Sequence, residues 1–427
     1  MPATASSKKS AMGFIFVTLL IDIMGWGLII PVMANLIAEL KHIPVNQAST
    51  YGAFLLSVFA IMQFLFAPVM GNLSDRYGRR PILLLALLGL GIDYIVLAVA
   101  PTYGWLFLGR MIAGMTGASF TTASAYIADI STDETRAKNF GMIGAAFGLG
   151  FVLGPALGAL LATWGIRAPF YAAAALCLLN CLWGYFMLPE SLDEAHRRPF
   201  EWKRANPFGS LKFLTKHPEI GELAFCFFLI YLAAQAVQGN WNFFTIYRFG
   251  WSEKMVGISL AVVGVLVGAV QAGLTRVVNP KIGDEKSIYL GLGLYTLGLV
   301  LFAFASETWM MFAFLIPYCL GGICGPSLQS VIAGHVAKNQ QGELQGALTS
   351  LMSVTTIIGP LIMNNAFSYF TSDKAPIHFP GIHFLIGAVF MLTSLFIIYR
   401  VLSREKKEHP EMISVIEGSA KKEEAAP

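Results

Sequence analysis

Twelve long apolar runs constrain this chain more than any other feature of its sequence. Each run has roughly 18 to 25 mostly apolar residues, and about 20 residues in a helix cross a hydrocarbon core of about 30 Å. The bilayer core offers backbone groups no water, so a chain crosses it as helices or as a closed barrel. The sequence therefore predicts an all-α integral membrane protein with twelve transmembrane helices. The expected spans are 12–34, 51–71, 81–100, 103–127, 140–163, 167–188, 219–245, 253–275, 286–305, 308–334, 342–369 and 380–402.

The composition excludes several other classes of protein. Charged residues make up 13% and apolar residues 56% of the chain, whereas soluble domains average about 25% charged residues. A net charge of +4 gives no case for nucleic acid. All five cysteines lie inside apolar runs without metal-ligand spacing, so no disulfide, metal or other cofactor is expected. The loops show no nucleophile–base set and no phosphate-binding glycine loop, so we do not expect an enzyme.

The positive charges are sorted by side of the membrane. If the chain starts inside, 23 of the 29 Lys and Arg residues fall on cytoplasmic segments, five fall outside and Arg110 lies within a span. Cytoplasmic loops of membrane proteins carry such an excess of positive charge. Both termini are therefore predicted to be cytoplasmic.

The stretch from Pro189 to Pro218 divides the series of spans in half. It is basic and polar, and it contains no run long enough to cross a bilayer. Two weakly similar six-helix bundles predict a substrate site near the membrane midplane between them, with alternating access by rocking of the halves. The expected parts are a cytoplasmic amino-terminus (1–11), an amino-terminal bundle (12–188), a central cytoplasmic loop (189–218), a carboxy-terminal bundle (219–402) and a cytoplasmic tail (403–427).

Three charged residues lie well away from the ends of their predicted spans, at a depth where charge is costly and usually functional. Asp22 and Asp93 lie near mid-depth in the first and third spans, and both are predicted to carry protons. The alternative is a structural ion pair with Arg110. Arg110 lies in the outer half of the fourth span, where it either extends to the interface or faces a cavity and acts on a nearby aspartate.

The seventh span is unusually rich in amides and aromatic residues, which suit hydrogen bonding and stacking against a planar ligand. Contacts between helices are the alternative role, and for Gln63 in the second span they are favoured. The predicted substrate-binding residues are Gln63, Tyr231, Gln235, Gln238, Asn242 and Tyr295.

Two charged loops are predicted to lie at the cytoplasmic face. The turn from Gly71 to Pro81 and the loop from Asp129 to Lys138 carry opposite charges that can form a gate, made in one transport state and broken in another. Solvated turns with weak surface pairs are the alternative. The predicted gating residues are Gly71, Asp75, Arg76, Gly78, Arg79, Arg80, Asp129 and Arg136.

The fifth span is rich in glycine. Gly150, Gly154 and Gly158 are four residues apart, which permits close backbone contact, and Pro155 removes a helical hydrogen bond. These four residues are predicted to form a sliding hinge, and ordinary helix packing is the alternative.

These features together resemble the twelve-helix drug/proton antiporters of the major facilitator superfamily, and within them the tetracycline/proton antiporters. The likeness covers nearly the whole chain and includes Asp22 to Pro31, Gly71 to Pro81, Asp93-Tyr94, Leu108-Gly109-Arg110 and the glycine-proline motif of the fifth span. The resemblance implies that Asp22, Asp93 and Arg110 act in coupling and substrate handling, and that Asp75 and Arg79 control a cytoplasmic gate. It also implies a location in the bacterial inner membrane. The expected partners are protons, lipid and a small-molecule substrate, and the expected state is a monomer.

Two positions depart from the resemblance. Tetracycline exporters of this type carry a histidine in the eighth helix, where this chain aligns Val267, and an aspartate in the ninth, where it aligns Tyr295. We therefore expect proton-coupled export of a small amphipathic compound, with coupling through the amino-terminal half and weak transport of tetracycline. A proton-coupled importer on the same fold and a non-transporting membrane sensor are the alternatives.

Overall fold

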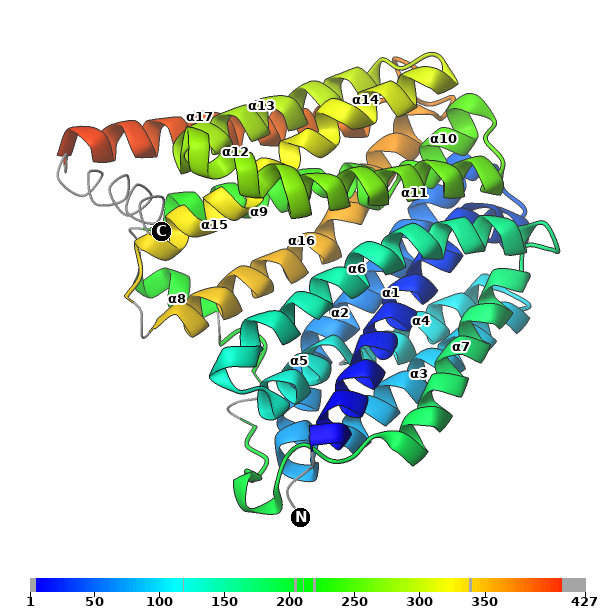
Figure 1. Ribbon diagram of the computed structural model, residues 1–427. Coiled ribbons are helices and arrows are strands. Elements are labelled where there is room, and N and C mark those ends of the chain that lie inside the picture. Colours follow the sequence, from blue (N-terminus) through cyan, green and yellow to red (C-terminus); the bar gives the residue numbers. More distant parts are fainter. Residues whose placement is uncertain are drawn as a thin grey trace. The chain divides into compact units, whose positions relative to one another are not determined.

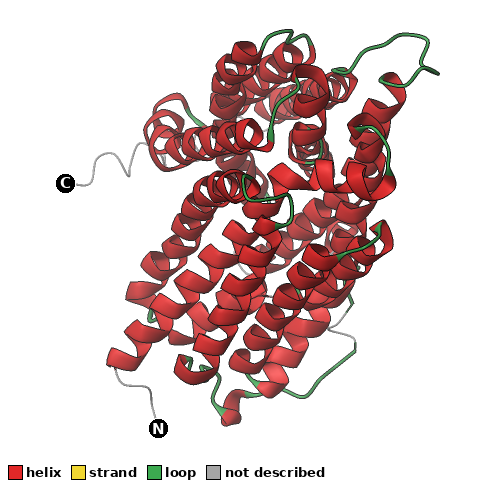
Figure 2. Cartoon of the chain, turned by 90° about the vertical axis from the view of Figure 1, so that its right-hand side faces the viewer, coloured by secondary structure: helices red, strands yellow, loops and turns green. Residues whose placement is uncertain are grey.

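The computed structural model describes residues 5–117, 119–202, 206–209, 211–217, 220–337 and 340–408, without the side chains of residues 5–10, 133, 134, 136–138, 211 and 405–408. Every regular element in these ranges is a helix (Figures 1 and 2). The α-helices are α1 (Ala5–Lys41), α2 (Val45–Tyr77), α3 (Arg79–Val99), α4 (Tyr103–Thr116), α5 (Ser119–Ile130), α6 (Asp133–Ala162), α7 (Ala168–Met187), α8 (Leu211–Lys216), α9 (Gly221–Gln238), α10 (Trp241–Phe249), α11 (Glu253–Ala269), α12 (Thr275–Ile282), α13 (Asp284–Ala303), α14 (Thr308–Leu320), α15 (Cys324–Gly334), α16 (Gln341–Phe370) and α17 (Ile382–Glu408). Short helical segments are η1 (Glu194–His196), the π-helical η3 (Val270–Leu274) and η4 (Gly321–Ile323).

The predicted all-α membrane fold is confirmed, with two differences in detail. Eleven helices in the described part of the chain are long and apolar enough to cross a membrane. The remaining expected span, 103–127, is divided between α4 and α5, and neither is long enough alone. The chain leaves the helix at Gly117, whose ψ of 45° is not helical. The expected seventh span is also divided, into α9 and α10.

The chain folds into two compact units. The first comprises residues 1–209, 239–265 and 356–378, and the second comprises residues 210–238, 266–355 and 379–427. Two segments from the predicted carboxy-terminal bundle, 239–265 and 356–378, therefore belong to the first unit. The boundaries fall at the end of α9 and inside α11 and α16. The division into two six-helix bundles by chain order stays a prediction.

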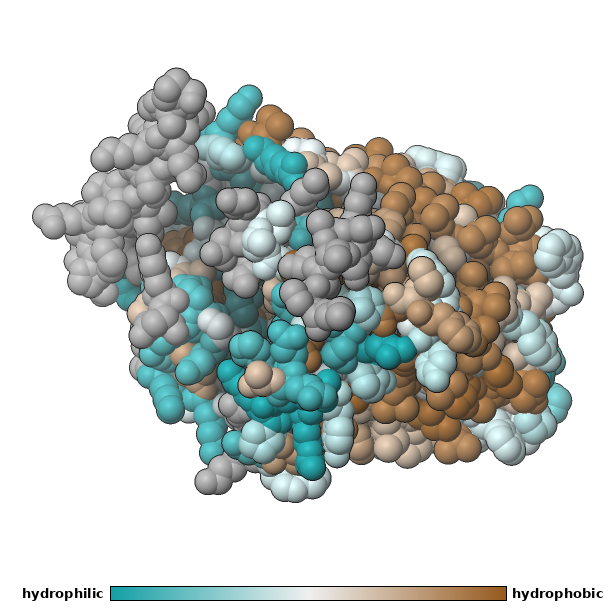
Figure 3. All heavy atoms as spheres, turned by 60° about the horizontal axis from the view of Figure 1, so that its bottom comes forward, coloured by the Kyte–Doolittle hydropathy of each residue, from teal (hydrophilic) through white to brown (hydrophobic). Residues whose placement is uncertain are grey.

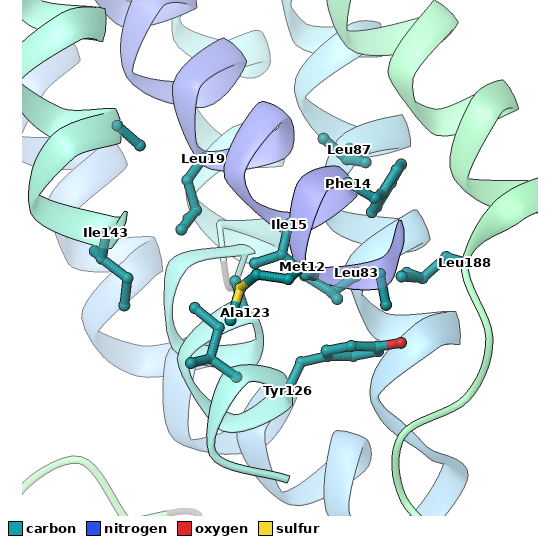
Figure 4. Packing of buried hydrophobic residues seen from close by; sticks show 13 residues of the cluster. Met12, Phe14, Ile15, Leu19, Leu83, Leu87, Ala123, Tyr126, Ile143 and Leu188 are labelled. Atoms are coloured by element: carbon teal, nitrogen blue, oxygen red, sulfur yellow. The ribbon is translucent and has the colours of Figure 1, made fainter. Parts of the chain in front are cut away.

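In the first unit α1 lies beside α6 (Figure 1), and α3 packs against α7 and α2 against α4. Figure 4 shows one buried apolar cluster of this unit, which includes Phe14 and Ile15 of α1, Leu83 of α3 and Tyr126 of α5. Burial of such side chains stabilises the packing by about 1.5–3 kcal/mol each. The Tyr126 hydroxyl donates to the Pro189 carbonyl at 2.8 Å, so this polar end of the ring is satisfied.

In the second unit α17 packs against α9 and α13, and α13 also packs against α14 and α15. Large apolar side chains are exposed in both units, among them Phe186 of α7 and Phe396 of α17. Figure 3 shows apolar side chains covering the right-hand part of the face in view, while polar ones gather towards its left. Such an apolar surface is unfavourable in water and is expected in contact with lipid.

Candidate functional site

Asp93 and Arg110 form a buried ion pair in the first unit. Asp93 lies on α3 and is 0% exposed, and Arg110 lies on α4 and is 5% exposed. Gly109 permits this approach, because a Cβ atom there would lie 2.7 Å from an Asp93 carboxylate oxygen. Of the alternatives left open by the sequence, the structure shows the ion pair and not extension of Arg110 to the interface.

Two aromatic rings flank the Arg110 guanidinium group. Its central carbon lies 5.7 Å from the Phe59 ring centre and 5.8 Å from that of Tyr94. A cation over an aromatic face is stabilised by about 0.5–2 kcal/mol, more when water is excluded. Tyr94 is a residue that sequence reasoning quoted only as part of a motif, and the structure makes it a direct neighbour of the pair.

Asp22 lies on α1 in a different electrostatic environment. Its carboxyl oxygens are buried, its polar neighbour is Ser119, and it forms no ion pair within the described residues. One helical turn further on, a Cβ atom at Gly25 would lie 2.9 Å from the Tyr94 hydroxyl. Tyr94 therefore lies between α1, close to Asp22, and the Asp93–Arg110 pair. One acid has a cationic partner and the other does not.

Two predicted substrate ligands are engaged with backbone groups. The Gln63 side chain donates to the Gly117 carbonyl at 3.1 Å, at the break between α4 and α5. The Asn242 side chain donates to the Ile30 carbonyl at 3.0 Å. Both amides satisfy carbonyl groups in this conformation, and substrate contact by either one stays a prediction.

The other predicted substrate ligands belong to the second unit. Gln235 is buried and Gln238, the last residue of α9, is exposed. Tyr231 lies on α9 and Tyr295 on α13, and the centre of the Tyr295 ring lies 5.1 Å from that of Tyr318.

Sequence reasoning missed Gln271, which lies in the π-helical segment η3. Its side chain donates to the Gly322 carbonyl at 3.4 Å, and a Cβ atom at Gly322 would lie 3.7 Å from the Tyr295 hydroxyl. The sequence offered one signal for this residue, because Gln271 is an amide one helical turn after Val267 in an otherwise apolar span. Segments of π-helix occur often at functional sites.

The predicted gate residues Asp75, Arg79 and Asp129 are brought together. An Arg79 guanidinium nitrogen lies 2.5 Å from an Asp75 carboxylate oxygen, and a second lies 3.1 Å from Asp129. The Ser74 hydroxyl accepts a further bond from Arg79 at 2.7 Å. The arrangement joins the last turn of α2 and the start of α3 to the end of α5, and its opening and closing stay a prediction.

Glu190 completes this cluster and was not expected from the sequence. Its carboxylate accepts from the backbone N–H groups of Arg79 and Arg80 at 2.8 and 3.2 Å, so it caps the start of α3. A carboxylate at a helix start satisfies free donors and favours the helix dipole. Gly78 has a φ of 103°, and any Cβ atom there would overlap the Glu190 side chain. The signal available in the sequence was an acidic residue directly after Pro189, at the start of the central loop.

The remaining predicted gate residues have other neighbours. Arg80 donates to the Tyr185 carbonyl at 2.5 Å, and Arg76 lies over the Tyr77 ring at 5.0 Å. The Gly71 carbonyl accepts a hydrogen bond from the Ser74 hydroxyl at 2.7 Å. The side chain of Arg136 lies outside the described residues.

The glycines of the predicted hinge form the contact between α6 and α1. A Cβ atom at Gly150 would lie 2.9 Å from Ile23, and one at Gly154 would lie 2.7 Å from the Met24 carbonyl. Gly158 faces the Leu28 backbone in the same way, and Pro155 packs against Gly27. Close helix packing is thus observed, and the hinge role stays a prediction.

Apolar helices that carry a buried acid–arginine pair are typical of membrane proteins that move protons, ions or solutes. The chain belongs to the Major Facilitator Superfamily, whose family model matches residues 15–360 and 249–422. It is 41% identical to the class C tetracycline resistance protein of Escherichia coli over 91% of this chain and 96% of that protein. It is 36% identical to the class B protein of Escherichia coli, over 90% and 93% of the two chains.

More distant similarities extend beyond these proteins. The human Hippocampus abundant transcript-like protein 1 is 26% identical over 89% of this chain and 78% of its own length. Among solved structures, the human organic anion transporter MFSD10 (TETRAN) superposes with a TM-score of 0.69 at 24% identity, covering 92% of this chain and 99% of that one. A bacterial homologue of the human lysosomal transporter Spinster gives 0.73 at 14% identity, covering 93% and 97%. These structures support the fold alone.

Proposed function

We propose that this transporter exports a small, partly apolar organic compound in exchange for protons, in a bacterial inner membrane with both termini in the cytoplasm. The observation that carries the proposal is the buried pair of Asp93 and Arg110, with a second acid, Asp22, near it. Relatives named as tetracycline resistance proteins at 35–41% identity support drug export. The excess of positive charge on the predicted inner segments supports the orientation.

The ion pair offers a physical means of coupling. When Asp93 takes a proton, Arg110 loses its counter-charge, and an unpaired charge in a buried site costs about 3–5 kcal/mol. That cost favours a conformation in which Arg110 finds another partner, and Asp22 is a nearby acid without one. Each proton that enters at 100 mV contributes about 2.3 kcal/mol. This is enough to accumulate an exported compound severalfold without nucleotide hydrolysis.

The substrate class follows from the polar groups of the second unit. Tyr231, Tyr295 and Gln271 are neutral, and Val267 is 40% exposed where the resembling exporters carry a histidine. Neutral side chains at these positions give no counter-charge to a metal-chelated cation. Aromatic and amide groups instead suit planar compounds that are uncharged or weakly basic. Such compounds are the proposed substrates, and magnesium-tetracycline is a poor one.

A substrate screen tests this proposal. The full chain is placed in vesicles that contain a pH-sensitive dye, and proton release is recorded after addition of magnesium-tetracycline, or of acridine and other uncharged or weakly basic aromatic compounds. We expect release with at least one aromatic compound, and an imposed pH gradient then shows the direction of transport. Radiolabelled compounds that cross the membrane without any proton movement would contradict the proposal.

A further inference from the structure

The seventh helix breaks where the chain passes from the second compact unit into the first. α9 ends at Gln238 and α10 begins at Trp241, and Asn240 between them has φ −129° and ψ 0°. A helix end leaves backbone carbonyls without intrahelical partners. The Asn364 side chain of α16 donates to the Gly239 carbonyl at 3.1 Å, so the break is held by an amide from another helix.

The same amide also binds α2. Asn364 donates to the Ser49 carbonyl at 3.1 Å, and the Ser49 hydroxyl donates to the Asn240 side-chain oxygen at 2.8 Å. Ser49, Asn240 and Asn364 are each 0% exposed. These three residues, here called the Asn364 cluster, join α2, the break in the seventh helix and α16.

Further hydrogen bonds surround the cluster within the first unit. Asn46 donates to the Thr371 carbonyl at 3.1 Å, Asn35 to a Glu253 carboxylate oxygen at 2.6 Å and Ser57 to the Ile357 carbonyl at 2.6 Å. Each bond joins α1 or α2 to a segment that follows the central loop in the chain. Ser49 lies near the start of α2, at the opposite end of that helix from Asp75. The contacts therefore close the end of this unit that the charge pattern predicts to be outer.

The break in the fourth helix provides a contrast. There the Gly117 carbonyl is also satisfied by a side-chain amide, that of Gln63. Gln63 and Gly117 both precede the central loop. Their hydrogen bond therefore stabilises the break in the fourth helix within the predicted amino-terminal bundle alone. The Asn364 bonds instead join α2 to segments that follow the central loop, and alternating access by rocking of the two predicted bundles requires these contacts to break. Two buried atoms of the cluster, Asn240 Nδ2 and Asn364 Oδ1, have no hydrogen-bond partner within the described residues. Contact with water on opening would satisfy both.

We infer that Asn364 is a positioning residue that holds the broken seventh helix against α2 and keeps this end of the pathway closed. Opening exchanges its two backbone hydrogen bonds for water. The inference deepens the proposed transport function by naming the contact that must break at the predicted outer end. It does not depend on which compound is carried.

The test measures access to a buried position beside the cluster. Ala53 lies on α2 four residues after Ser49, on the same helix face, and is 0% exposed. Ala53→Cys is introduced into the full chain after the five native cysteines are replaced. The protein is studied in lipid nanodiscs, where both faces are in solvent, and the rate of labelling by a membrane-impermeant maleimide is recorded. No substrate or proton gradient is used, so failure of proton-coupled transport would leave this measurement unaffected.

Asn364→Leu removes both bonds and is expected to raise the labelling rate about tenfold, because a hydrogen bond of about 1 kcal/mol changes a population severalfold. Ser49→Ala removes one hydroxyl and is expected to act in the same direction with less risk of misfolding. Asn180→Leu is the matched control, since Asn180 is a buried amide that donates to Thr18 at 3.0 Å within the first seven helices. Unchanged labelling in both Asn364→Leu and Ser49→Ala, or an equal rise in Asn180→Leu, would overturn the inference.

Discussion

Gly109 of α4 lies directly against the Asp93 carboxylate, with room for a hydrogen atom but not for a methyl group. A Cβ atom there would lie 2.7 Å from the carboxylate oxygen. The absence of a side chain at residue 109 is therefore what lets Arg110, its neighbour in the sequence, pair with Asp93.

Gly109→Ala should displace the Asp93 carboxylate from Arg110 and lower substrate-induced proton release at least tenfold, with insertion into the membrane unchanged. The matched control is Gly104→Ala on the same helix, where an added Cβ atom would meet only Thr102 at 3.8 Å. Vesicles carrying each variant at equal protein amounts provide the comparison. Equal proton release from the two variants would show that the close approach at residue 109 has no part in coupling.

Glu190→Ala should lower thermal stability, because the start of α3 then loses an acceptor for two backbone N–H groups. Loss of a cap costs about 0.5–2 kcal/mol. The melting temperature of the purified protein in one detergent is the measurement. Glu194 is the control, since its side chain is 91% exposed and its pair with Arg197 is 4.0 Å long. If Glu194→Ala lowered the melting temperature as much as Glu190→Ala, the cap at the start of α3 would not explain the loss of stability.

Asp75→Asn should weaken the contact with Arg79 and shift the protein towards cytoplasm-open states, which slows transport and leaves substrate binding intact. Distances between spin labels on the predicted cytoplasmic ends of α6 and α16 would report the shift. The Arg79–Asp129 contact remains in this variant, so we expect a partial change in the distance distribution. An unchanged distribution would mean that the loop is a solvated turn.

Expression in a drug-sensitive host should give little resistance to tetracycline and more to apolar or weakly basic aromatic compounds. The reason is that Tyr295 and Val267 stand where the resembling exporters carry an aspartate and a histidine, and neither offers a chelated cation a counter-charge. Growth at graded drug concentrations is the measurement, with empty vector as the control. Strong tetracycline resistance that disappears in Asp93→Asn would show that the missing acid and histidine are dispensable.

Much of the fold was predictable from the sequence, because a bilayer forces apolar runs of this length into helices. The breaks at Gly117 and Asn240 were not, since each depends on an amide from another helix that satisfies the freed carbonyl. The charges of Asp75, Arg79 and Asp129 indicated a shared membrane face, and the structure brings them into contact. Pairing of Asp93 with Arg110 was only one of the alternatives, because depth in the membrane does not determine which way a side chain points.

Residues whose partners are backbone groups were the hardest to assign. Glu190 and Asn364 are separated in sequence from the groups they bind, and no local pattern specifies those partners. Asn242 was predicted to contact a ligand because it lies in a span rich in amides and aromatic residues. In this conformation, however, its amide donates to the Ile30 carbonyl. Composition identifies a polar span, whereas tertiary packing determines which of its amides are free.

We propose that Asp93 and Asp22 carry the protons that drive export. The most direct measurement is substrate-induced proton release in vesicles by the Asp22→Asn, Asp93→Asn double variant, beside Asp373→Asn, an exposed acid of a loop, as the control. We predict that the double variant still inserts and binds the compound, because an amide is nearly isosteric with a neutral acid, and that it releases no protons while the control behaves as the wild type. Proton release at the wild-type level from the double variant would contradict the claim.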